Sequence, residues 1–201
     1  SHNPAKYNGY KAYGPDGCQM TDVAADIVYA EIQKTDILDG AKIMGFEEGM
    51  EAGLISYVGD DCKEALYAAI EARSVRPGLC KTAGLKLVYS PLNGSGLVPV
   101  TRILSDIGID DVTIVPEQQY PDGNFPTCPY PNPEIFEALR LGLELAEKSG
   151  ADLMLATAPD ADRVGIAIKC PDGTYELVSG NEVGVLLLDY ICAGRIENGT
   201  M

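Results

Sequence analysis

The sequence has few cations, no close pair of cysteines and no long apolar run, and each shortage excludes a class of protein. Fifteen lysine and arginine residues stand against thirty aspartate and glutamate residues, which gives a formal net charge of −15 at pH 7. We expect no nucleic-acid partner, because no basic surface is available to neutralise backbone phosphates. A small phosphorylated substrate remains compatible, since a local cluster of cations can lie inside an acidic protein. No apolar run approaches the ~20 residues of a membrane-spanning helix, so no membrane partner is expected.

The cysteines are spread thinly along the chain. The six are Cys18, Cys62, Cys80, Cys128, Cys170 and Cys192. No two lie within four residues of each other, so the paired spacing of a zinc site is absent. They are also too sparse for a disulfide scaffold. We therefore predict free thiols in a reducing, cytoplasmic compartment.

The first part of the chain predicts a partial domain. Residues 9–20 indicate a hairpin around the turn "GPDG". Thr21 or Asp22 can cap a helix over 23–34, whose apolar positions fall roughly on one face. Glycines then interrupt the pattern. We interpret residues 1–55 as part of an α/β domain that lacks most of its core.

The second part, residues 56–201, alternates apolar strands with helices. Strands are predicted at 85–90, 111–116, 151–157, 164–169 and 174–179. Helices are predicted at 60–73, 97–108, 133–149 and 183–191. Strands joined by helices should be parallel, and the last two strands form a hairpin that adds antiparallel pairing. We therefore expect a three-layer α/β/α domain with a mixed, mainly parallel sheet, preceded by the partial α/β domain.

Capping residues mark two of these helices. Asn132 is placed to cap one helix, with Pro133 at its first position and Gly150 just past its end. Ser179 and Glu182 have the spacing of a capping box before the last helix.

Two loops follow strands at the edge where ligand sites of open α/β sheets lie. The loop "NGSG", residues 93–96, could cradle a phosphate with its amides, but no lysine follows and a glycine turn for close packing is favoured. The loop "APDADR" is more specific. Asp160 and Asp162 can aim two carboxylates at one hard cation such as Mg²⁺, and Arg163 offers a planar fork for phosphate oxygens. The spacing alone is equally compatible with a simple turn between two strands.

The chain opens with a polar run, "SHNP". Ser1, His2 and Asn3 place a hydroxyl, an imidazole and an amide in sequence, and His2 is the only histidine of the chain. Ser1 would need activation by a base or a metal to act as a nucleophile. Lys11 is a nearby cation or proton carrier. Taken alone, this run indicates a polar loop.

Together these motifs resemble the α-D-phosphohexomutases, in their phosphoglucomutase/phosphomannomutase branch. "SHNPAKYNGYKAYGPDG" is similar to the active-site serine loop of that family, and "APDADRVGIAIK" to its metal loop, D-x-D-x-D-R before an apolar strand. "LVYSPLNGSGLVPVTRIL", "PNPE" and "LVSGNEVGVLLLDYI" are also family-like and lie in the expected order. The resemblance covers essentially the whole chain, and the joint occurrence of both loops makes it specific.

The resemblance implies an enzyme that interconverts hexose 1-phosphate and hexose 6-phosphate. A phosphoserine transfers its phosphate to the sugar, a hexose 1,6-bisphosphate turns around and also serves as activator, and the other phosphate returns. The family has four domains. This chain resembles the end of the first, with the serine loop at residues 1–55, and the second, with the metal loop at residues 56–201. The third and fourth domains would be partners, and the fragment alone is expected to be inactive.

The resemblance also assigns roles to the serine loop. Ser1 would carry the phosphoryl group, and its oxygen would join the metal ligands. His2 belongs to the same catalytic loop, and Asn3 would help to bind phosphate. Lys11 matches the family lysine near the reacting oxygen.

In the metal loop the match is incomplete. Asp160 and Asp162 match the second and third aspartates that hold Mg²⁺. Arg163 matches the arginine that follows, and it would bind phosphate or steady a neighbouring carboxylate. The first aspartate of the family pattern falls at Ala158. Because one carboxylate is replaced by a methyl group, weak Mg²⁺ binding is expected.

Three other functions remain open from the sequence. "DADRV" fits the D-x-D-x-[TV] pattern of haloacid-dehalogenase-like phosphatases, although Ala158 and Pro159 separate it from its strand. A metal-dependent nucleotide-sugar transferase could also use Asp-x-Asp. The third alternative is an inert, non-catalytic domain.

Overall fold

The computed structural model describes residues 6, 11–36, 38–40 and 42–200, which fall into two compact units. The smaller unit is Asn8–Lys63, and the larger contains Glu64–Met201. Ser1, His2 and Asn3 lie outside the described residues. The division between domains at residues 55 and 56 stays a prediction, and each unit is described by itself below.

The described residues of the smaller unit form one chain reversal, two complete helices and the first residues of a third. Tyr13 and Gln19 form an isolated antiparallel bridge around the turn, which confirms the reversal within the predicted hairpin, whereas residues 9 and 10 lie outside the described part. Helix α1 is Asp22–Ile32, with Thr21 as its N-cap residue, and helix α2 is Phe46–Glu51. No residue of α1 is buried, so its apolar face has no cover among the described residues of this unit.

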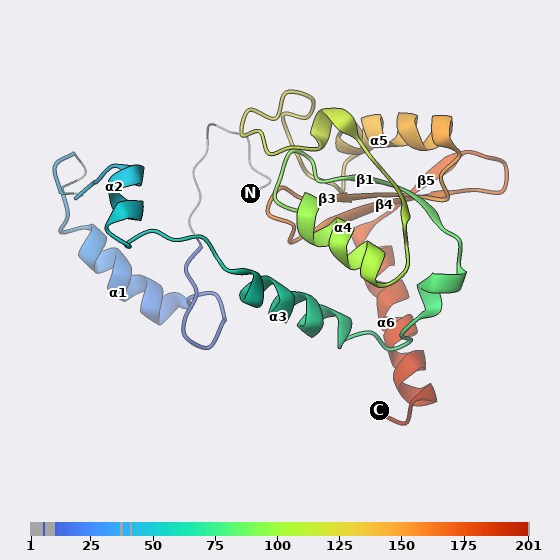
Figure 1. The fold of residues 1–201 in the computed structure, drawn as a ribbon, viewed down its shortest axis with the longest axis horizontal. Helices are drawn as coiled ribbons and strands as arrows, with labels where there is room; N and C mark the ends of the chain where they lie inside the picture. Colours follow the sequence, from blue (N-terminus) through green and yellow to red (C-terminus); the bar gives the residue numbers. More distant parts are fainter. Residues whose placement is uncertain (1–5, 7–10, 37, 41, 201) are drawn as a thin grey trace. The chain divides into compact units, whose positions relative to one another are not determined.

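The larger unit is built on a five-stranded sheet in the order β2-β1-β3-β4-β5 (Figure 1). The strands are β1 Lys86–Ser90, β2 Asp111–Ile114, β3 Leu153–Thr157, β4 Val164–Lys169 and β5 Tyr175–Val178. β1 pairs in parallel with both β2 and β3, while β4 pairs antiparallel with β3 and β5. The predicted mixed sheet, with three parallel strands and an added hairpin, is confirmed.

Helices cover both faces of this sheet, which confirms the three-layer α/β/α architecture (Figure 1). Helix α5, Phe136–Ser149, packs on one face, where Val88 and Met154 belong to the same buried cluster. Helix α4, Leu97–Asp106, covers the other face, where Leu87 and Tyr89 are buried. Successive side chains of a strand point to opposite faces, so the apolar residues Leu87–Tyr89 of β1 contribute to the core on both sides of the sheet.

Two predicted helix ends differ in outcome. The predicted start at Asn132 and Pro133 is wrong: α5 begins at Phe136, with Ile135 as its N-cap residue. The Asn132 carboxamide instead accepts a hydrogen bond from the Glu134 N–H at 3.1 Å, which closes a local turn before the helix. The end is confirmed, because Gly150 takes a left-handed conformation at φ 71° directly after the helix.

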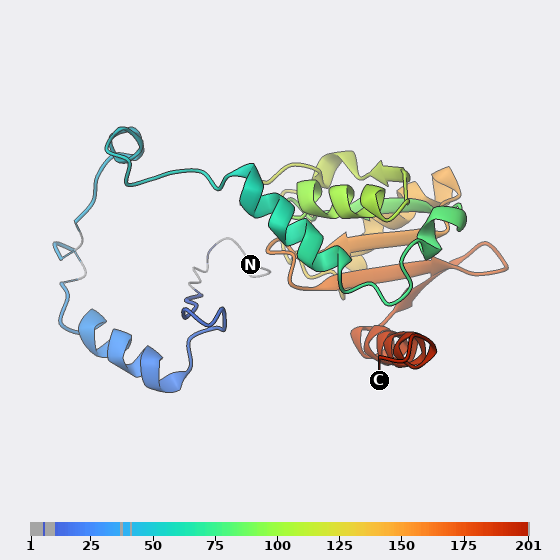
Figure 2. The same cartoon turned by 60° about the horizontal axis from the view of Figure 1, so that its bottom comes forward.

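Helix α6, Gly180–Glu197, begins at the predicted capping box. The Ser179 hydroxyl accepts from the Glu182 N–H, and the Glu182 carboxylate accepts from the Ser179 N–H at 2.8 Å. Its last turn is held by Arg76, which makes two bonds of 2.9 Å to the Glu197 carboxylate and lies over the Tyr190 ring. In Figure 2 the helix is viewed nearly along its axis and stands apart from the layers of α4 and α5.

Helix α6 also exposes a long apolar surface. Its exposed apolar side chains are Val185, Leu186, Leu187, Leu188, Tyr190, Ile191 and Ile196. Among the described residues, no helix combines the length and the apolar character needed to cross a membrane. The three remaining helical segments are α3 Asp60–Glu71 and two 3-10 turns, Leu79–Thr82 and Pro116–Gln118.

Candidate functional site

The loop between β3 and β4 holds the predicted carboxylates in a tight turn. The Ala161 N–H donates to the Ala158 carbonyl at 2.8 Å, and the Ala158 N–H donates to the Arg163 carbonyl at 3.0 Å. Ala161 has φ 57°, a left-handed conformation that is uncommon for a residue with a side chain. Asp160 and Asp162 flank this residue, so one short turn carries both carboxylates at the carboxyl end of β3.

Arg163 is the last residue of the loop, and part of its guanidinium group is buried. Its Nε lies 3.9 Å from Asp162 Oδ1, at the outer limit of an ion pair. Its Nη2 is buried and has no hydrogen-bond partner among the residues that the structure describes. Burying a guanidinium N–H without an acceptor costs free energy, so Nη2 is a candidate donor to an oxygen of a ligand. An anionic oxygen would form the strongest bond. Asp160 Oδ1 is buried as well.

The donors of the loop fit a hard divalent cation in part. Magnesium is held in proteins by one or two carboxylates together with waters and phosphate oxygens. Asp160 and Asp162 supply that number of carboxylates, while the neighbouring Ala158 is fully buried and offers no ligand atom in its side chain. Within the described ranges, no group of three or more histidine, cysteine, aspartate or glutamate side chains could hold a metal ion.

The loop "NGSG" packs closely against this turn. A Cβ added to Gly94 would overlap the backbone of Pro159, and one added to Gly96 would come within 2.6 Å of Thr157 Oγ1. Gly94 is therefore required for contact between the two loops, and Gly96 for contact with the ends of β1 and β3, in agreement with the packing interpretation favoured from the sequence. Beneath them, Tyr89 Oη and Thr157 Oγ1 share a buried hydrogen bond of 2.8 Å.

Burial changes the chemistry of that tyrosine. It raises the pKa of Tyr89 to about 12, because an anion would lose its solvation there, while the hydrogen bond to Thr157 acts in the opposite direction. Tyr89 is thus a neutral hydroxyl under the loop at physiological pH. Sequence reasoning identified neither Tyr89 nor Thr157, since their pairing joins strands 68 residues apart.

The structure brings three of the predicted site residues together. Asp160, Asp162 and Arg163 lie in the single turn after β3. Lys11 is exposed and belongs to the smaller unit, whereas Ser1, His2 and Asn3 lie outside the described residues. The predicted roles of the serine loop and of Lys11 therefore stay predictions.

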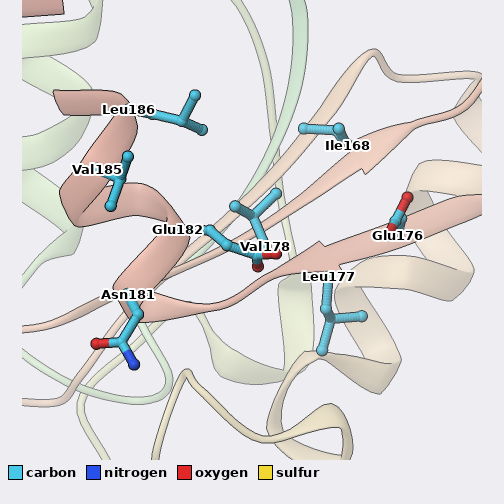
Figure 3. A pocket seen from close by; sticks show the side chains of 8 residues that line it. All are labelled: Ile168, Glu176, Leu177, Val178, Asn181, Glu182, Val185 and Leu186. Atoms are coloured by element: carbon cyan, nitrogen blue, oxygen red, sulfur yellow. The ribbon is translucent and has the colours of Figure 1, made fainter. Parts of the chain in front are cut away.

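A separate cavity of about 520 Å³ lies elsewhere on the larger unit (Figure 3). Its lining comes from β4, β5 and the first half of α6, and includes Ile168, Val178, Val185 and Leu186. None of the loop residues 158–163 contributes to it. The lining is mostly apolar and has no lysine or arginine, so the cavity does not suit a sugar phosphate.

Comparison with known proteins gives two matches to family descriptions. "Phosphoglucomutase/phosphomannomutase, alpha/beta/alpha domain II" matches residues 66–173, which contain the β3–β4 loop. The corresponding domain I description matches residues 1–38, which contain the serine loop.

Two phosphoglucomutases agree with these matches. A phosphoglucomutase of Staphylococcus saprophyticus is 33% identical over 200 residues, covering 100% of this chain and 36% of that protein. A phosphoglucomutase of Staphylococcus aureus is 33% identical over 190 residues, covering 94% and 34%. Among solved structures, a phosphoglucomutase/phosphomannomutase family protein of Burkholderia thailandensis has a TM-score of 0.42 and 29% identity, over 55% of this chain and 22% of that one. The chain thus spans about a third of the length of the two phosphoglucomutases.

Proposed function

The chain belongs to the phosphoglucomutase/phosphomannomutase family. On that premise we propose that it forms part of a phosphohexomutase, an enzyme that interconverts hexose 1-phosphate and hexose 6-phosphate. The observation that carries this proposal is the turn at the end of β3, where two carboxylates and a half-buried guanidinium are held together. The domain I match supports it, because it covers Ser1 and Lys11.

In this proposal Ser1 carries the phosphoryl group. The bond between phosphorus and Ser1 Oγ breaks while a bond forms to a free hydroxyl oxygen of the sugar phosphate. The hydroxyl proton passes to the departing serine oxygen, with Lys11 as its carrier. His2 and Asn3 shape the loop around the phosphate. The hexose bisphosphate then turns around, and the reverse reaction returns its other phosphate to Ser1.

The β3–β4 loop supplies charge and orientation. Asp160 and Asp162, with an oxygen of phosphorylated Ser1, would hold Mg²⁺, and a bound Mg²⁺ offsets negative charge on the transferring phosphoryl group. Arg163 has a buried Nη2 that can donate to a phosphate oxygen, which orients the group and keeps its charge near the turn.

We assign the complete catalytic cycle to a protein with all the domains of the longer relatives. The chain covers 36% of the Staphylococcus saprophyticus phosphoglucomutase. The third and fourth family domains would supply further sugar and phosphate contacts and exclude water, so we expect no steady turnover from these 201 residues by themselves. The six free cysteines support a reducing compartment such as the cytoplasm.

A single phosphoryl transfer tests the proposal without requiring turnover. The chain is incubated with Mg²⁺ and glucose 1,6-bisphosphate labelled in both phosphates, and the labelled peptide is mapped. We expect label on Ser1, none in Ser1→Ala, and at least a tenfold slower transfer in Asp160→Asn. Glu147→Gln, an exposed change on α5, serves as the control and should transfer at the rate of the unmodified chain.

The same experiment separates the alternatives. Label on Asp160 would identify a haloacid-dehalogenase-like phosphatase. Absence of label together with calorimetric binding of UDP-glucose would favour a nucleotide-sugar transferase. Absence of both would indicate an inert domain and overturn the proposal.

A further inference from the structure

The loop between β1 and α4 begins with a conformation that proteins rarely adopt. Leu92 and Asn93 have φ 48° and φ 54°, and the Gly94 N–H donates to the Pro91 carbonyl at 2.9 Å across them. Left-handed backbone brings the Cβ of a residue such as leucine close to its own carbonyl oxygen. Such a turn persists only where its surroundings hold it, and it frequently serves a function.

A buried polar network holds this turn. The Ser90 hydroxyl donates to Gln118 Oε1 at 2.6 Å and accepts from the Leu92 N–H at 3.1 Å. The Asn93 N–H donates to the Gln118 carbonyl at 2.9 Å, and Asn93 Nδ2 donates to the Tyr120 carbonyl at the same distance. The network ties the end of β1 to the segment after β2, so the strained turn is rigid.

The rigid turn places Ser95 against the loop that carries the aspartates. The Ser95 N–H and the Ser95 hydroxyl both donate to one acceptor, the Pro159 carbonyl oxygen, at 2.8 and 3.0 Å. Gly94 has no room for a side chain at the same contact. Pro159 directly precedes Asp160, so these bonds fix the point from which the acidic turn departs.

We propose that Ser95 is a positioning residue for the metal-binding turn: its two hydrogen bonds to the Pro159 carbonyl set the direction of Asp160 and Asp162. The inference rests on the proposed function, which gives these carboxylates a cation to hold. A carbonyl in a turn needs only one donor, and the Ser95 N–H already supplies it. The hydroxyl adds a second bond, which restrains the turn from rotating about the first.

The test compares three variants of the 201-residue chain. Ser95→Ala removes the hydroxyl bond, and Ser95→Thr keeps it. Ser105→Ala is the matched control, because it removes a serine bond of the same length, 3.0 Å, to Asp110, elsewhere on the larger unit. Amide exchange at Ala158 and Ala161 reports the turn without any metal. Mn²⁺ alone, followed by its electron paramagnetic resonance, reports the carboxylates.

For Ser95→Ala we expect exchange at Ala161 and the Mn²⁺ dissociation constant each to rise about threefold to tenfold, as the loss of one hydrogen bond implies. Ser95→Thr should restore both, and Ser105→Ala should change neither. Unchanged exchange in Ser95→Ala would overturn the proposal, and so would faster exchange with unchanged Mn²⁺ affinity. If the unmodified chain binds no Mn²⁺, or if Asp160→Asn leaves its Mn²⁺ affinity unchanged, the metal site of the proposed function fails. Ser95 can then no longer be said to direct the carboxylates towards a cation.

Discussion

Tyr89 Oη and Thr157 Oγ1 lie 2.8 Å apart at the carboxyl ends of two neighbouring parallel strands, β1 and β3. Both side chains are buried, and Gly96 lies directly over the pair. The hydrogen bond therefore joins the two strands at the point where the glycine loop and the acidic loop depart from them.

Removing the tyrosine hydroxyl should destabilise the larger unit. Tyr89→Phe leaves the Thr157 hydroxyl buried without this partner, and an unsatisfied buried group costs about 1–3 kcal/mol. Urea unfolding measures the loss. Tyr130→Phe, at an exposed position, should have no effect. The double variant Tyr89→Phe with Thr157→Val should recover part of the loss, and no recovery would show that the hydrogen bond is not the cause.

The same pair predicts a dependence on alkaline pH. The pKa of Tyr89 is raised from 10.0 to about 12 in the folded chain. The neutral hydroxyl therefore contributes its full stabilisation below pH 10 and loses it as the pH rises towards 12, by at most about 3 kcal/mol. The difference in unfolding free energy between the unmodified chain and Tyr89→Phe should shrink over that interval. A constant difference up to pH 12 would contradict the raised pKa.

An acid-dependent contribution is expected at the end of α6. The Arg76 guanidinium, bonded twice to Glu197, lowers the pKa of that carboxyl below its ordinary 4.5. The stabilisation is complete above pH 4.5 and is lost as the pH falls through the lowered value. Glu197→Gln should flatten the acid limb of the stability curve, while Glu147→Gln should leave it unchanged. Identical acid limbs for Glu197→Gln and the unmodified chain would show that the pair adds nothing.

Two glycine substitutions should act in opposite directions. A Cβ at Gly165 would overlap the carbonyl group of Pro133. Because the overlapping atoms belong to the backbone, they cannot move aside as a flexible side chain could. Gly165→Ala should destabilise by about 1–3 kcal/mol. Gly184 lies within α6 with nothing near an added Cβ, so Gly184→Ala should stabilise by about 0.5–1 kcal/mol. Thermal unfolding compares the two, and a neutral Gly165→Ala would mean that the segment at Pro133 moves aside freely.

Adding a third carboxylate to the turn should make stability depend on metal. Ala158 is fully buried, so Ala158→Asp without metal should cost roughly 2–5 kcal/mol for an uncompensated charge. A third carboxylate should strengthen Mg²⁺ binding by about one to two decades, and Mg²⁺ should then recover much of the lost stability. Calorimetric titration and unfolding with and without Mg²⁺ measure both effects.

The control for that substitution is Ala156→Asp, at another fully buried position two residues earlier in β3. It should destabilise the chain equally with and without Mg²⁺. Equal Mg²⁺ affinities for Ala158→Asp and the unmodified chain would show that residue 158 does not face the cation.

Features set by neighbouring residues were predictable from the sequence. The alternation of strands and helices, the end of α5 at Gly150 and the capping box at Ser179 depend on short-range spacing, and the structure confirms them. The start of α5 was not predictable, because the Asn132 carboxamide can serve either a helix or a turn. Packing of Pro133 against Gly165, which is distant in sequence, favours the turn.

The site divides in the same way. Asp160, Asp162 and Arg163 are contiguous, so their pattern identifies the turn. The hydrogen bonds that reach Pro159 from the other loop come from Ser95, which is 64 residues away, and a serine between two glycines carries no signal of such a partner. The contact arises because the sheet places the ends of β1 and β3 side by side, which the local sequence does not indicate.

The apolar surface of α6 has a consequence for how the chain behaves in solution. Exposed leucine and valine side chains attract one another between molecules, whereas the net charge of −15 keeps the molecules apart. Salt shortens the reach of that repulsion to about 8 Å at physiological ionic strength and leaves the short-range attraction in place. Added salt therefore favours self-association of the chain, whereas in salting-in added salt increases solubility.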